Sequence, residues 1–231
     1  MIPLLKKGIC FNKTFYYFNK DKDIYNPCDC HTNTYISFYD RNYLEVEKRE
    51  KDFKYVTGLL TYDNGQDKYC VVHSWVEDNG EIIDTTSLAN SQLKILNSLP
   101  KEEINQIKNL LEEKIGYIPY SSLDNKQFTL KCQDIYSKCG YNQEKVIEYI
   151  EKYLISIAQS VEKDKRYLEE VKSKLGYEYK ADGFQIEIKW EKAVGKWNAP
   201  QKLDKTFGGA FLCQEVRNTI ANTRQSSKYL L

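Results

Sequence analysis

The chain has 231 residues, with 34 lysines and arginines against 33 aspartates and glutamates, so its formal net charge at pH 7 is +1. This balance argues against nucleic acid or an anionic membrane as the main partner, and no stretch approaches the roughly 18 apolar residues of a membrane-spanning helix. The N-terminus lacks the apolar core and cleavage site of a signal peptide, and seven cysteines without disulfide-like spacing favour reduced thiols in the cytoplasm.

The first elements precede residue 53. Residues 8–20 alternate aromatic and polar side chains, which indicates a strand or an irregular segment. After the turn signal Asn26-Pro27, apolar and aromatic residues recur at helical spacing and stop in the charged run Glu47–Asp52. We therefore expect a helix from about Cys30 to Lys48, with a thiol in its first turn.

Three strands are expected next. Phe53–Tyr62 is rich in β-branched and apolar residues, and Asp63–Asp67 has the composition of a turn. Lys68–Glu77 and Glu81–Thr86 are two further apolar runs with a two-residue turn signal between them. Because all the connections are short, the strands should be antiparallel.

The turn signal is Asn79-Gly80, which predicts a β-hairpin because both central residues of a type I′ turn need positive φ. A two-residue loop pairs Asp78 with Glu81 and then Val76 with Ile83. A four-residue loop on the same centre keeps this register, whereas a three-residue loop shifts it by one residue and turns the second strand over.

The register decides whether His73 can meet Asp84. Side chains alternate faces along a strand, so His73 and Trp75 share one face, and Asp84 opposite Trp75 lies there too. His73 and Asp84 are then diagonal neighbours with backbones about 7–8 Å apart, a distance that a carboxylate and an imidazole can bridge.

The second half of the chain is expected to be mainly helical. Ser87–Leu99 and Lys101–Lys114 indicate short helices, the first of them partly loop. Residues 142–175 carry a heptad pattern over four repeats, on a helix about 50 Å long that only Asp164 interrupts. The seven-residue series comprises Ile147, Leu154, Val161, Leu168 and Leu175. These apolar residues form a seam along one face of the helix. The seam would pack either against a second copy, in a homodimeric coiled coil, or within the chain, against residues 101–114 or a C-terminal helix.

Two further elements are expected near the C-terminus. Gln185–Trp190 alternates like an exposed strand, and Gly208-Gly209 precedes an amphipathic helix at about Ala210–Thr223. Gly208-Gly209 alone is not a phosphate- or dinucleotide-binding loop, so no cofactor is expected.

A thiol, an imidazole and a carboxylate in the order Cys30, His73, Asp84 form a candidate nucleophilic triad. If Asp29 caps the helix, the helix dipole favours a thiolate at Cys30, although the charge of Asp29 opposes it. The backbone amides at residues 30 and 31 are natural oxyanion donors. Three asparagine side chains are also available for that role: Asn12, Asn26 and Asn33.

Each of these residues has a simpler explanation. Free cysteines are commonly buried small hydrophobic residues, and Cys28 is a rival nucleophile. His31 is expected to face solvent at the helix start. The ligand types in Cys28-Asp29-Cys30-His31 lack the usual zinc spacing and a second pair, so no metal is expected. Cys132 and Cys139 look like packing thiols.

The motif residues also resemble a known family. Cys-x-x-Asn opens the predicted helix at Cys30, Tyr-Val-x-Gly-Leu follows from Tyr55, and His-Ser-Trp-Val-Glu with Asn-Gly and Ile-Asp-x-Thr spans residues 73–86. Over residues 28–90 the chain is similar to papain-like cysteine proteins of the transglutaminase-like superfamily. In that superfamily a helix-borne cysteine faces a histidine and an aspartate on neighbouring strands.

The resemblance implies an α+β fold with a papain-like, transglutaminase-type core in residues 1–100. A mainly helical region, 101–231, then follows or completes the same domain. The resemblance also places Cys30, His73 and Asp84 in catalytic positions. It makes two further residues substrate-binding candidates: Asn33, one helical turn after the thiol, and Trp75, two residues after the histidine. The expected activity is that of a thiol hydrolase or acyl transferase on an amide or peptide bond. The alternatives are an inactive papain-like module that binds a protein partner and a coiled-coil assembly protein.

Overall fold

The computed structural model describes residues 4–20, 30–39, 53–63, 65–90, 101–140 and 142–181. The chain divides into two compact units, 1–197 and 198–231, and every described residue belongs to the first. This unit combines helices with a six-stranded, largely antiparallel sheet, so the α+β class expected from the sequence is confirmed. None of its described helices is long and apolar enough to cross a membrane.

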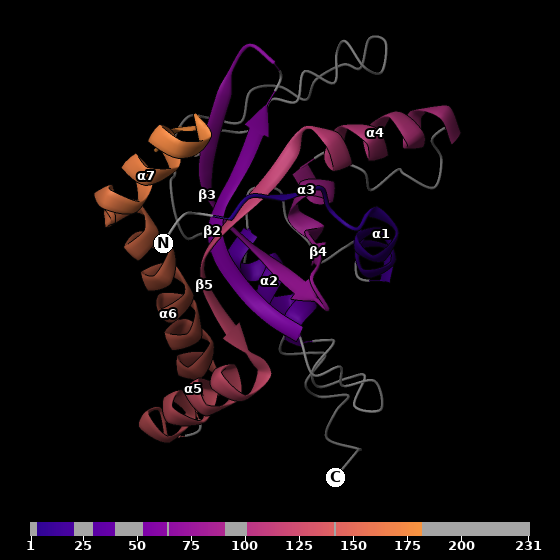
Figure 1. Ribbon diagram of the computed structural model, residues 1–231. Helices are drawn as coiled ribbons and strands as arrows, with labels where there is room; N and C mark the ends of the chain where they lie inside the picture. The colour runs from indigo at the N-terminus through magenta and orange to yellow at the C-terminus, as the bar shows by residue number, and fades with distance from the viewer. Residues whose placement is uncertain are drawn as a thin grey trace, which may run out of the picture. The chain divides into compact units, whose positions relative to one another are not determined.

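The helices and strands of this unit are labelled in Figure 1. The helices are α1 (Phe11–Lys20), α2 (Cys30–Tyr39), α3 (Thr85–Asn90), α4 (Lys101–Glu113), α5 (Asn125–Lys138), α6 (Gln143–Lys163) and α7 (Lys165–Leu175). The strands are β1 (Lys6–Lys7), β2 (Phe53–Asp63), β3 (Lys68–Asp78), β4 (Glu81–Ile83), β5 (Ile115–Asp124) and β6 (Glu178–Tyr179). The sheet order is β1-β5-β2-β3-β4, and β6 pairs with β3 in parallel.

The β3–β4 hairpin has the register that the sequence predicts. Asn79 (φ 50°) and Gly80 (φ 82°) both have positive φ, as a type I′ turn requires. Asp78 pairs with Glu81, and Val76 pairs with Ile83. The strand after the turn is shorter than expected, because it ends at Ile83 and α3 begins at Thr85.

Strand β5 was not predicted, yet it lies between β1 and β2 in the sheet. Its sequence contains Gly116 and Pro119, which weaken the pattern of a strand. Pro119 lies opposite Gly58, where the β2–β5 register shifts. Adding a Cβ to Gly58 would bring it 2.1 Å from the carbonyl oxygen of Ile118, so only glycine permits this close approach. The sheet therefore draws on residues from both sides of position 100.

Helix α1 replaces the strand or irregular segment expected for residues 8–20. Phe11, Thr14 and Phe18 are buried and recur at helical spacing, whereas Asn12 and Tyr16 are exposed. The aromatic–polar alternation is too short to outweigh this helical face.

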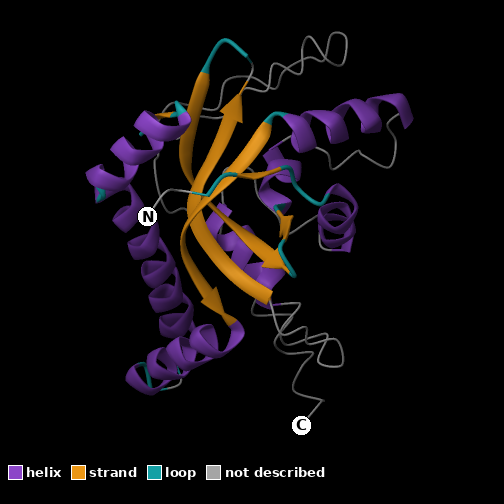
Figure 2. Cartoon of the chain, viewed as in Figure 1, coloured by secondary structure: helices purple, strands orange, loops and turns teal. Residues whose placement is uncertain are grey.

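The two faces of the sheet meet different helices. Tyr55, Leu59 and Val76 point to one face, which α6 covers and which we call the α6 face. His73 and Trp75 point to the other, which we call the Trp75 face. Figures 1 and 2 show α5, α6 and α7 following one another along one side of the sheet and α1, α3 and α4 beyond the other.

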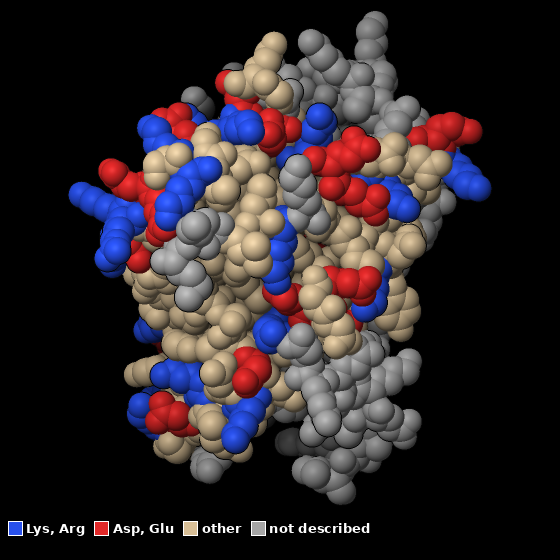
Figure 3. Space-filling view, in the orientation of Figure 1, with Lys and Arg blue, Asp and Glu red and all other residues tan. Residues whose placement is uncertain are grey.

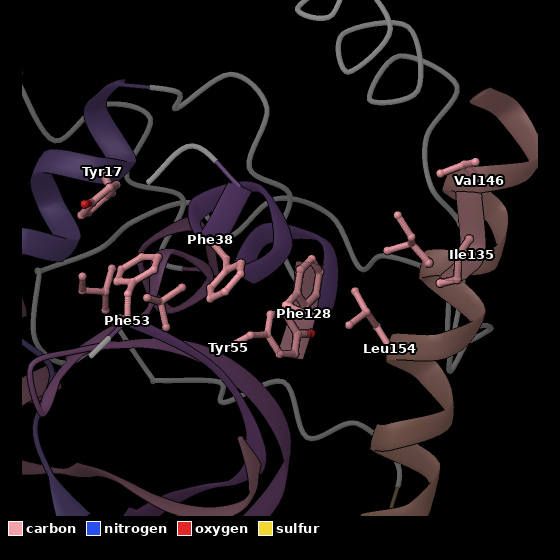
Figure 4. Packing of buried hydrophobic residues seen from close by; sticks show 11 residues of the cluster. Tyr17, Phe38, Phe53, Tyr55, Phe128, Ile135, Val146 and Leu154 are labelled. Atoms are coloured by element: carbon pink, nitrogen blue, oxygen red, sulfur yellow. The ribbon is translucent and has the colours of Figure 1, made fainter. Parts of the chain in front are cut away.

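A cluster of aromatic and aliphatic side chains packs on part of the α6 face (Figure 4). Its centre is Phe38 of α2, whose ring centroid lies 5.3 Å from that of Phe53 and 4.9 Å from that of Phe128. Val146, Ile150 and Leu154 of α6 complete it. We call this the aromatic cluster, and it joins α2, α5 and α6 to the sheet.

The heptad segment is two helices rather than one, so the expectation of a continuous helix was wrong. Asp164 separates α6 from α7, with φ −80° and ψ 77°, and its carboxylate accepts a hydrogen bond from the backbone N–H of Tyr167. Leu154 and Val161 of the seven-residue series, and also Val171 of α7, are buried within this chain's own core. These side chains thus pack within the chain, and a homodimer through residues 142–175 stays a prediction.

Several expected elements lie outside the described residues: the helix beyond Tyr39, the part of Ser87–Leu99 that follows Asn90, the strand at Gln185–Trp190 and the helix at Ala210–Thr223. On the face shown in Figure 3, basic and acidic side chains are interspersed, with no single-sign patch among the described residues of that view. This distribution agrees with the balanced charge of the sequence.

Candidate active site

Helix α2 begins beside an interruption in the pairing of β3. On the side of β3 away from β2, β4 pairs only with residues 76–78 and β6 only with residues 69 and 70. The described strands therefore leave residues 71–75 without a neighbour on that side. The first turn of α2 contacts β3 here, so side chains from both faces of the sheet can reach Cys30.

The thiol of Cys30 forms a hydrogen bond with the imidazole of His73. On the other side of the ring, His73 Nε2 lies 2.8 Å from Asp84 Oδ2. Because Nε2 is used by the carboxylate, Nδ1 is the ring nitrogen left for the thiol. The structure thus brings together the three residues that the sequence predicts as a triad, with His73 and Asp84 buried and Cys30 partly exposed.

Asp84 is held by five hydrogen bonds, which together fix the position of its carboxylate. The backbone N–H groups of Thr86 and Ser87 each donate to Oδ1 at 3.1 Å. His73, the Ser87 hydroxyl (2.6 Å) and the Tyr117 hydroxyl (2.9 Å) surround Oδ2. We call this group the carboxylate network. It also explains the early end of β4, because the same carboxylate begins α3.

The charges of the site stabilise one another. Burial alone would raise the pKa of the Cys30 thiol, but the fields of His31 and His73 and their hydrogen bonds hold it well below its usual value. Burial disfavours the imidazolium of His73, yet the charges of Asp84 and Cys30 raise its pKa to about 10. The carboxyl pKa of Asp84 is lowered, against the effect of burial, mainly by the charge of His73. A thiolate and an imidazolium are therefore the favoured pair near neutral pH.

No protein-family model, curated protein or solved structure matches this chain. The resemblance to transglutaminase-type proteins thus rests on the motif residues of positions 28–90, and what the site does is argued below from its chemistry.

Two predicted substrate-binding residues have structural partners instead. Asn33 is fully buried, and its side-chain amide donates to the Thr86 hydroxyl at 3.0 Å, which ties α2 to α3. Trp75 is also fully buried and packs on Tyr117 with ring centroids 5.1 Å apart. Its indole N–H has no hydrogen-bond partner within the described part of the chain. Neither side chain presents a surface to a substrate in this structure.

Other candidates are placed or left aside as follows. Asn12 is exposed on α1 and is not assigned to the site, and Asn26 and Cys28 lie outside the described residues. Cys132 and Cys139 are partly buried beside the aromatic cluster, as packing thiols would be. Among the described residues there is no group of three or more side chains that would hold a metal ion.

Sequence reasoning missed two side chains that touch the triad. Tyr117 comes from the unpredicted strand β5, and burial and the charge of Asp84 keep its pKa well above the usual value, so it remains a neutral donor. His31 was expected to face solvent, but it is only partly exposed, bonds the Cys30 thiol and lies 2.7 Å from the Ser74 hydroxyl. Ser74 follows His73 and points to the opposite face of the same strand, and no signal in the sequence indicated that His31 would meet it.

Proposed function

We propose that the protein is a thiol-dependent hydrolase or acyl transferase acting on an amide or peptide carbonyl, with Cys30 as nucleophile. The observation that carries this proposal is the buried His73–Asp84 pair, 2.8 Å apart, in hydrogen-bond contact with a thiol in the first turn of a helix. Thiolates are strong nucleophiles, and both the imidazolium and the helix N-terminus favour the thiolate.

The proposed reaction has two steps. The Cys30 thiolate attacks the carbonyl carbon and forms a carbon–sulfur bond, while the carbon–nitrogen bond breaks and the His73 imidazolium gives its proton to the leaving amine. Water or an amine then attacks the thioester and loses a proton to His73, and the electron pair of the carbon–sulfur bond returns to sulfur. The negative oxygen that forms in each step lies near the start of α2, where backbone N–H groups are available.

Asp84 orients the imidazole in this proposal. A carboxylate on Nε2 selects the tautomer that has Nδ1 toward the thiol, and it stabilises the imidazolium. The hydrogen bonds from Thr86, Ser87 and Tyr117 keep that carboxylate in place and ionised. His73, Asp84 and these donors form a preorganised unit before any substrate binds.

The order of the residues and the geometry of the site support a papain-like, transglutaminase-type core. A helix that carries the thiol packs on an antiparallel sheet whose neighbouring strand and strand end carry the imidazole and the carboxylate. This assignment suggests a protein or peptide substrate, since amides of that kind are the substrates such a core acts on.

The test is alkylation of the full chain with iodoacetamide from pH 5 to 9, with the modified cysteines quantified by mass spectrometry. Cys30 should react fast below pH 7. Cys139, partly exposed at the C-cap of α5, serves as the internal comparison in the same sample. His73→Gln should reduce Cys30 labelling at pH 6 on the order of 100-fold, because the thiol pKa returns toward about 8.5.

A Cys30 profile that matches that of Cys139 in the unmodified protein would reject the proposal. It would leave the chain as a papain-like module whose site is not catalytic and which acts through a protein partner.

A further inference from the structure

The Cys30 thiol lies between two imidazoles, although a nucleophilic triad needs only one. His73 reaches it from the Trp75 face of β3, and His31 reaches it from the next position of α2. These are the two histidines of the entire 231-residue chain. Both therefore converge on one sulfur atom.

Hydrogen bonds to β3 hold His31 in place, just as a hydrogen bond to the Asp84 carboxylate holds His73. Its Nδ1 lies 2.7 Å from Ser74 Oγ, and Ser74 Oγ lies 2.9 Å from Thr57 Oγ1 of β2. Ser74 and Thr57 are buried and directly paired in the sheet. The hydroxyl of Thr34 in α2 donates to the Ser74 carbonyl oxygen at 2.8 Å, so the helix is tied to the residue that positions the ring.

We propose that His31 is a second catalytic imidazole, which donates a hydrogen bond to the Cys30 sulfur and stabilises its negative charge while His73 carries the proton to and from the substrate. The inference rests on the proposed function of Cys30. This role requires His31 Nδ1 to accept from the Ser74 hydroxyl, with Ser74 in turn accepting from Thr57, and this tautomer leaves the ring N–H for sulfur. No charge on His31 is needed, because a neutral imidazole with this tautomer is already a donor.

The different roles of His73 and His31 follow from the proton balance of the reaction. Once His73 has given its proton to the leaving amine it is neutral, and it accepts a proton again from the attacking water. Sulfur must be expelled as a thiolate at the end of this second step, when the carbon–sulfur bond breaks. A donor that keeps its proton throughout stabilises sulfur at that moment, and the hydroxyl chain behind His31 suits it to this role.

The arrangement of β3 makes two donors possible. Successive residues of a strand point to opposite faces, so His73 and Ser74 cannot both approach one group packed on a single face. Cys30 avoids this restriction because α2 begins where residues 71–75 have no described strand on the side of β3 away from β2. His73 reaches the thiol directly from one face, and Ser74 acts through His31 from the other.

The first experiment uses the unmodified protein. Proton NMR titration of the two histidine C2–H signals is recorded before and after iodoacetamide has converted Cys30 to its uncharged thioether. Removing the negative charge of sulfur should move both titration midpoints to lower pH, each by roughly one unit or more if both rings touch the thiolate. A shift confined to a single histidine would overturn the proposal.

The second experiment compares variants by the alkylation profile of Cys30. His31→Gln keeps an amide that can bond Ser74 but changes the donor at sulfur, and the reactivity midpoint should rise by about one pH unit. Ser74→Ala, which retains His31 but removes its support, should shift the midpoint in the same direction by less. Urea unfolding of each variant establishes that the folded state is being compared.

The outcomes separate this proposal from the one on which it rests. An ordinary thiol profile in the unmodified protein would reject Cys30 as a nucleophile. A low midpoint that His73→Gln raises and His31→Gln leaves unchanged would preserve the proposed function and reject the second imidazole. A midpoint that both variants raise supports His31 in the catalytic role.

Discussion

The two ends of α2 are attached to the rest of the molecule by different interactions. At the C-terminal end, Phe38 is fully buried among aromatic rings of the sheet and of α5. At the N-terminal end, the contacts are hydrogen bonds of Cys30, His31, Asn33 and Thr34 with β3 and α3. Apolar packing is nearly non-directional, whereas hydrogen bonds weaken steeply with angle and distance.

This difference suggests a separation of stability from alignment along one short helix. The aromatic end should contribute most of the free energy that holds α2 on the sheet. The polar end should contribute less net stability, because its groups exchange hydrogen bonds with water for hydrogen bonds with protein. It fixes instead where the thiol lies relative to two imidazoles. The four predictions that follow test this separation, from the largest expected effect to the smallest.

Truncation of the aromatic end should lower stability without altering thiol chemistry. Phe38→Ala should reduce the free energy of unfolding by about 3–5 kcal/mol, because it removes a buried ring and leaves a cavity. Phe38→Leu, which fills part of the space, should cost less and provides a folded protein if the first variant is too unstable. Urea unfolding measures both effects, and the alkylation midpoint of Cys30 in the folded Leu variant should match the unmodified protein. A shifted midpoint would mean that the aromatic end also aligns the site.

Asp84→Asn should change both the stability of the protein and the reactivity of the Cys30 thiol. Both carboxylate oxygens of Asp84 accept hydrogen bonds in the unmodified protein. An asparagine side chain has only one oxygen, so in either orientation its N–H₂ group faces a hydrogen-bond donor. The expected loss is about 3 kcal/mol, as for a buried ion pair that loses one partner. The alkylation midpoint of Cys30 should rise, since His73 loses the charge that favours its protonated form. An unchanged midpoint would show that Asp84 does not act through His73.

Two turn glycines provide a matched pair. Gly80 (φ 82°) and Gly65 (φ 87°) are both exposed, and a Cβ at either would meet no atom within 4 Å. Alanine at each should cost about 1–2 kcal/mol from its left-handed conformation alone. Neither change should move the Cys30 midpoint, because the carboxylate network holds the hairpin register. A midpoint shift in Gly80→Ala but not in Gly65→Ala would show that the turn itself keeps Asp84 on its face.

The smallest effect is a flat region in the pH dependence of stability. The His73 pKa is raised from 6.5 to about 10, which by itself makes stability fall as pH rises through that range. The Cys30 pKa is lowered from 9.0, which makes stability rise with pH up to about 9. Between about pH 6.5 and 9 the folded pair and the unfolded pair each bind one proton, so these effects cancel, and stability should fall only above about pH 9.

Cys30→Ala removes the effect of the thiol on the pH dependence of stability and leaves that of His73. The charge of Asp84 still raises the His73 pKa, so stability of the variant should decline across pH 6.5 to 9 where the unmodified protein stays level. Urea midpoints at half-unit pH steps would show the contrast. Parallel curves for the two proteins would argue against the thiolate–imidazolium pair.

Local signals allowed the sequence to predict the part of the site that is local in the chain. Asn79-Gly80 set the hairpin register, and the alternation of strand side chains then placed Asp84 with His73. The start of α2 at Cys30 was also predicted. These features depend on turn geometry and on residues close in sequence, which a single sequence displays directly.

The missed parts depend on contacts between distant residues. Tyr117 reaches Asp84 only because β5 lies beside β2, and Gly116 and Pro119 concealed that strand. The heptad of residues 142–175 correctly indicated apolar helical faces, but periodicity does not name the surface on which a face packs. Thr57 and Ser74 behind His31 form a direct pair of the β2–β3 ladder. The turn expected at residues 63–67 pairs Tyr62 with Lys68, one residue away from the observed register, so it does not reveal this pair.

The length of α6 has a consequence for how this chain can vary. Val146, near its start, belongs to the aromatic cluster, and Val161, near its end, belongs to a second cluster with Leu59 and Ile118. Fifteen residues at 1.5 Å per residue separate these anchors by about 22 Å. A seven-residue insertion would preserve the phase of the seam yet displace one anchor by about 10 Å. The spacing of these two clusters on the sheet therefore dictates the length of α6.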